Sequence, residues 1–506
     1  MVINVGYEKN RIQSIAIRRS VNMRIVSGKS LISSALLGAT WLLASSASAQ
    51  SAEVTFHKDI EPILQRSCQN CHRDGGAGPM PLITFDQVAP YAGLIEYKTG
   101  LRDRAGAMPP WYMEKNIGIQ SYKDDPSLSD EEIAAISSWA RSGTPKGDEA
   151  DAPESLVFDD SVKWQAGTPD LVVVMNDVTK LSGTPDWWGE IDYRPTGLTE
   201  DRYVKSVEVV EVNDVDNQAG TGRKTVGGRY IFHHMIWGTA QLDEKGERPA
   251  GQISIPWPVH EVGRNADIFD EDAGRLLKAG SWIVSDSVHL HSNGRDTTGH
   301  LEVGFTFHED DYKPKYQNAF IGLGNGVDIS IQGNQKDQEL HAYTVLDQHT
   351  KVITFEPHLH APGERMCLEA IWGYTIETLS CVGYDHNWVR GYPYTDDAAP
   401  LLPKGTILHI TGYMNNTSSN PNVPDPRNWQ GSGNRSVTNM FIDLGIRVTM
   451  TDEQFQDAME ERRQNLNLGP NDHVIGCPLC LAPLVAPVAE ERDSDDDTSN
   501  DIASTN

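Results

Sequence analysis

Basic residues are too few in this 506-residue chain to favour a polyanionic partner. Its 43 lysines and arginines stand against 71 aspartates and glutamates, which gives a formal net charge of -28 at pH 7. Proteins that bind nucleic acid or an anionic membrane surface need an excess or a patch of positive charge. The composition therefore argues against nucleic acid and anionic lipid as main partners.

Long apolar runs are also scarce, and the run near the N-terminus is too short for a membrane helix. It covers residues 31–43, follows a short basic region and precedes Ala47-Ser48-Ala49, which fits a signal-peptidase site. We expect residues 1–49 to be a signal peptide that directs the protein to the periplasm or out of the cell. No membrane span is expected after cleavage. Met23 is an alternative start, because the leader before it is unusually long.

Only six cysteines are present, and an even number in an exported protein suggests disulfides. Cys367 and Cys381 flank an expected hairpin, so we predict that they form a disulfide. Cys477 and Cys480 form a C-x-x-C pair without a redox fold around it, which favours a local disulfide over half of a zinc site. The remaining pair belongs to a different motif.

Residues 68–72 read Cys-Gln-Asn-Cys-His, the C-x-x-C-H pattern of covalent haem c attachment. The thiols of Cys68 and Cys71 would bond to the haem vinyl groups, and His72 would be an axial ligand of the iron. The spacing suits a helix end, which brings both sulfur atoms and the imidazole to one side. The sequence therefore predicts one covalent haem c.

A second axial ligand is expected downstream of this motif. Met108 lies in a loop flanked by proline, and a methionine opposite a histidine raises the haem potential. Met80 is the competing choice, but it follows His72 closely, where small cytochromes run a loop under the haem edge. We favour Met108.

A short amphipathic helix closes this part of the chain. Ser129 and Glu132 form a capping box at its start, and Gly143 ends it. The helix resembles the terminal helix of a small cytochrome c. We expect an all-α cytochrome c domain over residues 52–147, followed by a linker over residues 148–165.

From about residue 166 onward, helical periodicity is scarce and short β-prone runs alternate with turn residues. The number and length of these runs predict a mainly β fold with two tandem β-sandwiches, over residues 166–335 and 336–475. The acidic end of the chain, residues 476–506, reads as a disordered tail.

Histidines recur in close pairs on these expected strands. In an H-x-H pair, both imidazoles point to the same face of a strand, where they can chelate one metal. Imidazole-rich sites suit copper or zinc, and a nearby thioether favours copper. Met440, which follows a loop rich in glycine and serine, offers that thioether. The pairs are His233–His234, His289–His291 and His358–His360.

The FHHM run, the H-x-H strands and the late methionine resemble the copper type II, ascorbate-dependent monooxygenases. This family includes peptidylglycine α-hydroxylating monooxygenase and dopamine β-monooxygenase, and the resemblance spans about residues 170–450. It implies two jelly-roll-like β-sandwiches, each of which holds one copper. The first copper would be bound by His233, His234 and His291. The second copper would be bound by His358, His360 and Met440.

Two positions depart from a plain match. His289 lies two residues before His291 and could replace a ligand or support the ligands from outside. Met414 is a rival of Met440, which we prefer for its loop-then-strand context. The remaining histidines, such as His260 and His386, have no spacing that singles them out, and we expect them to be structural.

Neighbouring side chains on a regular strand point to opposite faces. If His233 and His234 both bind one copper, the strand cannot be regular there. We therefore expect a β-bulge or a strand end at this point.

The resemblance implies an exported copper-dependent monooxygenase that hydroxylates a C–H bond of a small organic substrate with O2. The copper of His358, His360 and Met440 would be the catalytic one, and the other would store an electron. Two coppers and one haem c would carry electrons from a periplasmic donor. One alternative is a haem and copper electron-transfer or copper-binding protein without an oxygenation substrate. Another is a β-sandwich binding module in which only the cytochrome is active.

Overall fold

The structure is a computed structural model in which eleven ranges of the chain are described. The expected signal peptide, residues 1–49, and the end of the chain after residue 480 lie outside these ranges. The described ranges are residues 53–74, 76–158, 164–215, 229–243, 246–248, 254–264, 266–319, 322–324, 328–433, 438–469 and 472–480. Within these ranges, none of the helices combines the length and apolarity that a membrane crossing requires.

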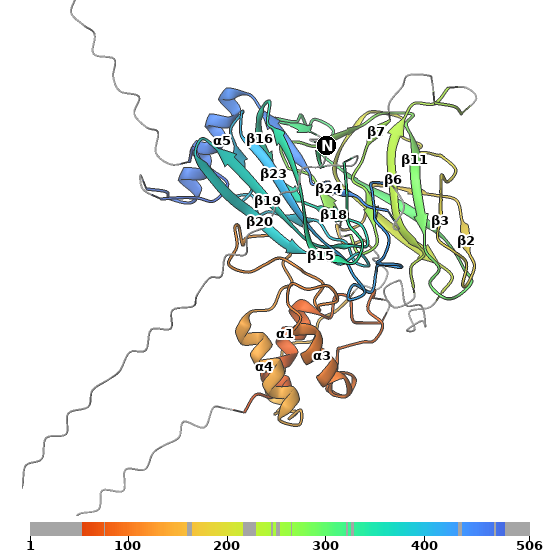
Figure 1. The fold of residues 1–506 in the computed structure, drawn as a ribbon, viewed down its shortest axis with the longest axis vertical. Coiled ribbons are helices and arrows are strands. Elements are labelled where there is room, and N and C mark those ends of the chain that lie inside the picture. Colours follow the sequence, from red (N-terminus) through yellow and green to blue (C-terminus); the bar gives the residue numbers. More distant parts are fainter. Residues whose placement is uncertain are drawn as a thin grey trace, which may run out of the picture. The chain divides into compact units, whose positions relative to one another are not determined.

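The chain from residue 53 to about 151 forms a helical module, drawn in red to orange in Figure 1. Phe56, Leu64, Ile136 and Trp139 form its buried core. The helices are η1 (Phe56–Ile60), α1 (Glu61–Ser67), α2 (Phe85–Val88), η2 (Ala89–Tyr91), α3 (Ala92–Thr99), α4 (Asp130–Arg141) and η3 (Glu149–Asp151).

The closing helix forms as its local signals predict. Ser129 accepts a hydrogen bond from the backbone of Glu132, and the Glu132 carboxylate accepts one from the backbone of Ser129 in return. This reciprocal capping satisfies backbone donors that the first turn of a helix leaves unpaired. Gly143, with φ of 89°, follows the end of the helix. The capping box and the glycine stop are therefore confirmed.

A first β-region, residues 171–307, consists of two antiparallel sheets whose buried side chains form one core. Val204 and Leu301 from one sheet meet Phe232 and Ile283 from the other in that core. One sheet has the order β1 (Leu171–Val174), β12 (Thr297–Phe307), β5 (Arg202–Asn213), β10 (Arg275–Leu277), with β2 (Val178–Lys180) on β12 and β9 (Asp267–Ile268) on β5. The other has the order β3 (Trp187–Gly189), β11 (Trp282–Leu290), β6 (Phe232–Ala240), β7 (Ile255–Pro256), with β4 (Arg194–Pro195) on β11 and β8 (His260–Glu261) on β6.

A second β-region, residues 317–450, is also antiparallel and is followed by α5 (Asp452–Asn465). One sheet has the order β15 (Gln335–Val345), β23 (Ile407–Asn416), β19 (Gly363–Trp372), β20 (Thr375–Gly383). Another has the order β13 (Gln317–Ala319), β25 (Arg447–Met450), β16 (His349–Val352), β22 (Leu401–Leu402). Two smaller sheets are β14 (Leu323–Gly324), β24 (Phe441–Asp443), β18 (Pro357–Leu359), and β17 (Thr354–Phe355) with β21 (Tyr392–Pro393). The mainly β expectation is confirmed.

The change from the first to the second β-region comes earlier than residue 335. β13 pairs with β25, and β14 pairs with β24, so the strands from Gln317 onward belong to the second region. Local sequence can predict that a run forms a strand, but it does not predict the pairing partner, because β25 and β24 lie more than one hundred positions further along the chain.

Both predicted disulfides are confirmed, between Cys367 and Cys381 and between Cys477 and Cys480. Cys367 and Cys381 pair directly across β19 and β20, the hairpin expected between them. Cys477 and Cys480 are buried in a small core with residues of α5. The packed chain therefore continues to Cys480, past the expected start of the tail at residue 476.

A segment of the helical module packs into the second β-region. Trp111, Met113 and Tyr122 are buried in the core of that region, and the Trp111 ring lies 4.9 Å from the ring of Tyr392. Met113 and Tyr122 also form isolated β-bridges to Val382 and Tyr394. The segment 111–122 therefore ties the helical module to the second β-region.

Candidate metal centre

A β-bulge places His233 where a regular strand would not. On β11, His289 and Leu290 are neighbours, yet their partners on β6 are His234 and Phe232. His233 is therefore the extra residue of the bulge. The irregular strand that the paired histidines predicted is confirmed, and it frees the His233 ring from the alternation of the sheet.

Three buried histidines converge at this bulge. Each of His233, His289 and His291 offers a ring nitrogen within 4.8 Å of the nitrogens of the other two. The Nε2 atoms of His289 and His291 are 3.1 Å apart. The Asp186 carboxylate lies 3.6 Å from Nε2 of His289 and 3.5 Å from Nε2 of His291. Three imidazoles in this arrangement can hold one metal ion.

The group differs from the expected ligand set in one member. His289 takes part in it, whereas His234 is not one of the three histidines whose nitrogens lie within that distance of one another, and its ring packs edge-on against Trp188. Trp188 also stacks on His289 at 3.8 Å. The sequence left open whether His289 replaces a ligand or supports the ligands from outside, and the structure brings it together with His233 and His291.

The environment keeps these rings in the form that binds metals. Burial lowers the pKa of His233 to about 4, and the positive charge that His289 would carry adds to the shift. Burial also lowers the pKa of His289. The rings of His233 and His289 are therefore neutral at pH 7, with lone pairs available for coordination.

One nitrogen of His233 is already committed. Its Nε2 lies 3.1 Å from the backbone carbonyl oxygen of His386, to which it can donate a hydrogen bond. Its Nδ1 is buried and has no partner among the described residues. A buried nitrogen without a partner costs free energy unless something binds it, so Nδ1 is the nitrogen that fits a metal.

A second histidine pair lies in the second β-region. His358 is in β18, and His360 follows directly after that strand. The β18–β24 register pairs Pro357 with Asp443 and Leu359 with Phe441, so its continuation sets His360 opposite Met440. Burial lowers the pKa of His360 to about 3, and the nearby charge of His358 contributes.

The two methionines differ in their surroundings. Met414 is buried in the core of the second β-region, next to Gly412 and Phe441. Met440 is half-buried and follows the loop that ends at Asn439. The register of β24 therefore favours Met440 as the partner of His360.

No protein-family profile matches this chain, and none of the curated proteins compared with it matches.

Glu261 is a site residue that the sequence did not reveal. It is buried on β8 in the first β-region, opposite His234 on β6. Its carboxylate accepts a hydrogen bond from Nδ1 of His358 in the second β-region. Burial opposes its ionisation, but the charge and hydrogen bond of His358 together with Arg264 hold the pKa of Glu261 below its ordinary value. A lone glutamate in a β-prone run carries no sequence signal for such a contact.

The C-x-x-C-H motif lies at the end of α1. Cys68 is the C-cap of this helix, and the backbone amide of His72 donates to the Cys68 carbonyl at 2.9 Å. Nδ1 of His72 lies 3.0 Å from the Met80 carbonyl oxygen, and this hydrogen bond leaves Nε2 as the remaining ring nitrogen. Both thiols are free of disulfides, and burial raises the pKa of the Cys68 thiol to about 12.

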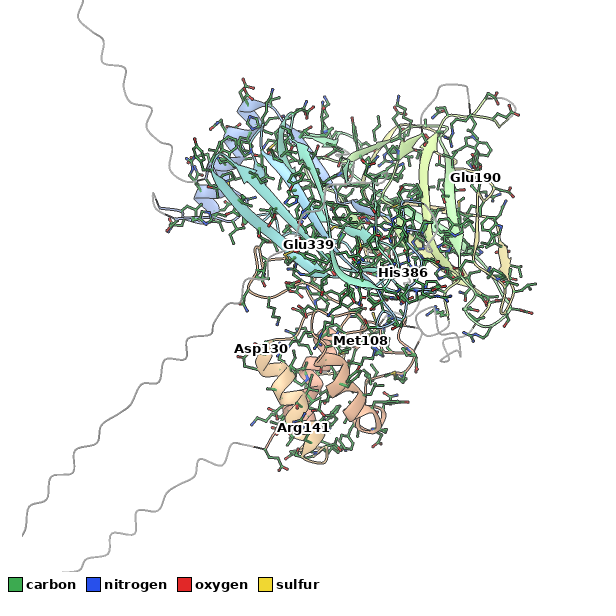
Figure 2. The ribbon with its side chains drawn as sticks, viewed as in Figure 1. Met108, Asp130, Arg141, Glu190, Glu339 and His386 are labelled. Atoms are coloured by element: carbon green, nitrogen blue, oxygen red, sulfur yellow. A yellow bond between two sulfur atoms is a disulfide. The ribbon has the colours of Figure 1, made fainter. Side chains whose placement is uncertain are left out.

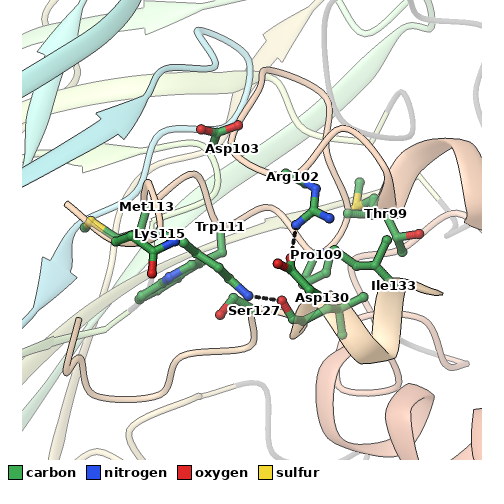
Figure 3. Close-up of a pocket in the computed structure, with 13 residues that line it drawn as sticks. Thr99, Arg102, Asp103, Pro109, Trp111, Met113, Lys115, Ser127, Asp130 and Ile133 are labelled. Carbon is green, nitrogen blue, oxygen red and sulfur yellow. Dashed lines mark hydrogen bonds and ion pairs between the residues drawn. The ribbon is translucent and has the colours of Figure 1, made fainter. Parts of the chain in front are cut away.

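Met108 lines a cavity of about 210 Å³ between α3 and α4 (Figure 3). Thr99, Trp111 and Ile133 share its wall, and Arg102 forms an ion pair with Asp130 beside it. Cys68, Cys71 and His72 are not among the lining residues. The choice of Met108 as the second axial ligand therefore stays a prediction.

Hydrogen bonds join the helical module to both β-regions. Arg229, which precedes β6, donates to the carbonyl of Gly76 at 2.9 Å, four residues after His72. The backbone amide of Gly106 donates to the carboxylate of Asp385 at 2.8 Å. The first of these contacts brings the loop after the C-x-x-C-H motif next to the strand that carries His233.

Proposed function

We propose that this protein is an exported copper-dependent monooxygenase that hydroxylates a C–H bond of a small organic substrate with O2. A haem c on the helical module would supply electrons from a periplasmic donor. The observation that carries the proposal is the buried group of His233, His289 and His291, with a second histidine pair in the adjoining β-region.

The donor set fits copper. It consists of imidazoles together with the thioether of Met440, which the continued β18–β24 register would set opposite His360, and such nitrogen and sulfur donors favour copper over hard metal ions. Bound copper would supply the one-electron redox chemistry that O2 activation needs. His233, His289 and His291 would hold one ion, and His358, His360 and Met440 would hold the other.

The neighbouring groups orient these ligands. The Glu261 carboxylate accepts from Nδ1 of His358 and so leaves Nε2 of that ring for a metal. The Thr438 carbonyl lies 3.2 Å from Nδ1 of His360, with the same effect. Acceptors behind ligand histidines fix the ring tautomer and orientation and raise the basicity of the ligand nitrogen.

The helical module supports the electron-supply part of the proposal. Cys68 and Cys71 are free thiols, whereas the other four cysteines of the chain pair with each other. A haem bonded to them would supply one-electron transfer. The hydrogen bond from Arg229 to Gly76 joins the attachment loop to the chain just before His233. We infer that a haem held there would lie nearer to the first histidine group than to the second.

A second candidate function is electron transfer or copper binding without an oxygenation substrate. The burial of the imidazoles favours it, because His289 is fully buried and His360 is only 2 % exposed. A substrate would need access that these side chains do not offer in this arrangement.

The experiment that tests the proposal measures metal content and turnover on the mature full-length protein. We expect two coppers and one covalent haem per chain. With a reductant and a metabolite library, O2 consumption should accompany a product that has gained one oxygen atom. Two coppers without such a product would favour the second candidate, and the absence of copper would overturn both.

A further inference from the structure

A compact group of polar side chains lies on the solvent-facing side of a sheet in the second β-region. β15 exposes alternate residues there, among them His341 and Glu339, which is labelled in Figure 2. Ala342, on the other side of the strand, is buried in the core. β23 pairs with β15 and brings His409 and Thr411 into contact with His341. Neither histidine belongs to the groups described above.

Three donor atoms of this group converge. Nδ1 of His341 lies 3.0 Å from Nε2 of His409. Oγ1 of Thr411 lies 3.3 Å from each of these two nitrogens. A metal ion with bonds of about 2.0–2.1 Å sets neighbouring ligand atoms about 2.9–3.4 Å apart, for bond angles between a right angle and the tetrahedral angle. The triangle of donor atoms therefore fits one face of such a coordination shell.

A hydrogen bond between the two imidazoles explains only part of this arrangement. One proton shared between Nδ1 of His341 and Nε2 of His409 would satisfy both nitrogens without an ion. The hydroxyl of Thr411, however, lies 3.3 Å from both nitrogens, beyond the usual hydrogen-bond range of about 2.7–3.2 Å. Its position between them fits a third ligand better than a third hydrogen-bonding partner.

Each ring has a carboxylate near the nitrogen that does not face the triangle. The Glu369 carboxylate on β19 accepts a hydrogen bond from Nδ1 of His409 at 2.7 Å, which leaves Nε2 for a metal. The Glu339 carboxylate lies 3.6 Å from Nε2 of His341. Acceptors in these positions fix the tautomer and orientation of ligand histidines and raise their basicity. Their negative charges also attract a divalent ion.

The group combines a fixed ring with an accessible one. Tyr343 stacks on His409, with ring centres 4.2 Å apart and planes within 3° of parallel. The side chain of His409 is 9 % exposed, whereas that of His341 is 43 % exposed. An ion can therefore reach the triangle from solvent, and water can complete its coordination.

We propose that His341, His409 and Thr411 form a binding site for a divalent ion of the zinc type, with an open coordination position toward solvent. Imidazole nitrogens suit zinc, and the triangle contains no sulfur that would favour Cu(I). The ion would replace the proton between the two rings and join β15 to β23. The inference does not depend on the proposed copper function, because no ligand of either proposed copper takes part.

The test is a Zn(II) titration of the mature full-length protein, without a histidine tag, in comparison with His341→Gln. The His341 side chain is partly exposed, so this variant should fold. After dialysis against micromolar zinc, wild-type protein should hold one zinc more than the variant, and zinc should raise its Tm further. Glu369→Gln keeps both imidazoles and should weaken the binding of this zinc about 10–100-fold.

His300→Gln is the matched control. His300 is on β12, its side chain is 22 % exposed, and its Nδ1 lies 2.7 Å from the Asp177 carboxylate. The control should hold as many zinc ions as wild-type protein. An equal zinc count in wild type and His341→Gln would overturn the inference and leave a hydrogen bond as the whole contact. Zinc in the buried histidine groups cancels in this comparison, and the copper content of wild-type protein tests the proposed function separately.

Discussion

Replacing Glu261 with glutamine should weaken the binding of one copper and leave the other unchanged. The carboxylate is buried, accepts from Nδ1 of His358, and is held ionised by His358 and Arg264 against the cost of burial. Glutamine has nearly the same shape but lacks the charge that fixes the His358 tautomer. Loss of such a partner typically lowers metal affinity 10–100-fold, which equals about 1.4–2.7 kcal/mol.

The assay is an anaerobic Cu(I) titration of the mature protein against a competing chelator. X-ray absorption identifies the weakened site by its sulfur ligand. Glu208→Gln is the matched control, because Glu208 is another buried carboxylate that accepts hydrogen bonds from the backbone of Gln165 and Ala166. Unchanged affinity at the sulfur-containing site would refute the orienting role of Glu261. An equal loss at both sites would instead assign Glu261 a role in the fold.

Four further predictions concern the C-x-x-C-H motif, the sulfur ligand, the electron path and the carboxyl group of Glu211. Cys71→Ser should weaken the haem stain that survives denaturation, and loss of haem from denatured wild-type protein would contradict covalent attachment. Met440→Ala should remove the sulfur scatterer from the X-ray absorption of the Cu(I) protein. Met414→Ala should keep that scatterer and lower stability by about 2–5 kcal/mol, and the reverse outcome would make Met414 the ligand. Met108→Ala should shift the haem potential and slow the O2 consumption that a protein donor drives, while the copper content stays the same. If the variant and the wild type consumed O2 at equal rates, the haem would not lie on the electron path. Burial raises the pKa of Glu211 from 4.5 to about 7, so the folded protein binds a proton there that the unfolded chain releases. The free energy of unfolding of the metal-free protein should therefore fall by up to about 3 kcal/mol as the pH rises from 4.5 to about 7. Glu211→Gln should flatten this dependence in urea denaturation, and an unchanged slope would contradict the assignment.

Features set by neighbours in the chain could be predicted from the sequence. The capping box of Ser129 and Glu132 involves residues three positions apart, and it forms as expected. A bulge or strand end at the paired histidines was predicted on the premise that both bind one copper; the bulge is present at His233, but His234 is not in the converging group. The disulfide of Cys367 and Cys381 needed only a hairpin between them.

Features set by distant contacts could not be predicted. The contact of Glu261 with His358 joins residues 97 positions apart, and neither has a local pattern that marks the other. His386 stands alone in its loop, and only the folded arrangement brings it to His233. The sheet to which β13 belongs could not be predicted either, because β-propensity indicates a strand but not the strand with which it pairs.

The burial of segment 111–122 in the second β-region bears on how this protein could be dissected. A chain started at residue 166 would lack Trp111 and Tyr122, and the loss of one large aromatic ring from a core costs about 3–5 kcal/mol. Tyr392 and Tyr394 would then lie open to solvent at the edge of the truncated protein. The segment between α3 and α4 thus anchors the helical module in the second β-region, so a cut at residues 148–165 would not separate the two cleanly. A design that replaces the helical module with another domain would have to keep residues 111–122 in the core of the second β-region and exchange only the helices before and after this segment.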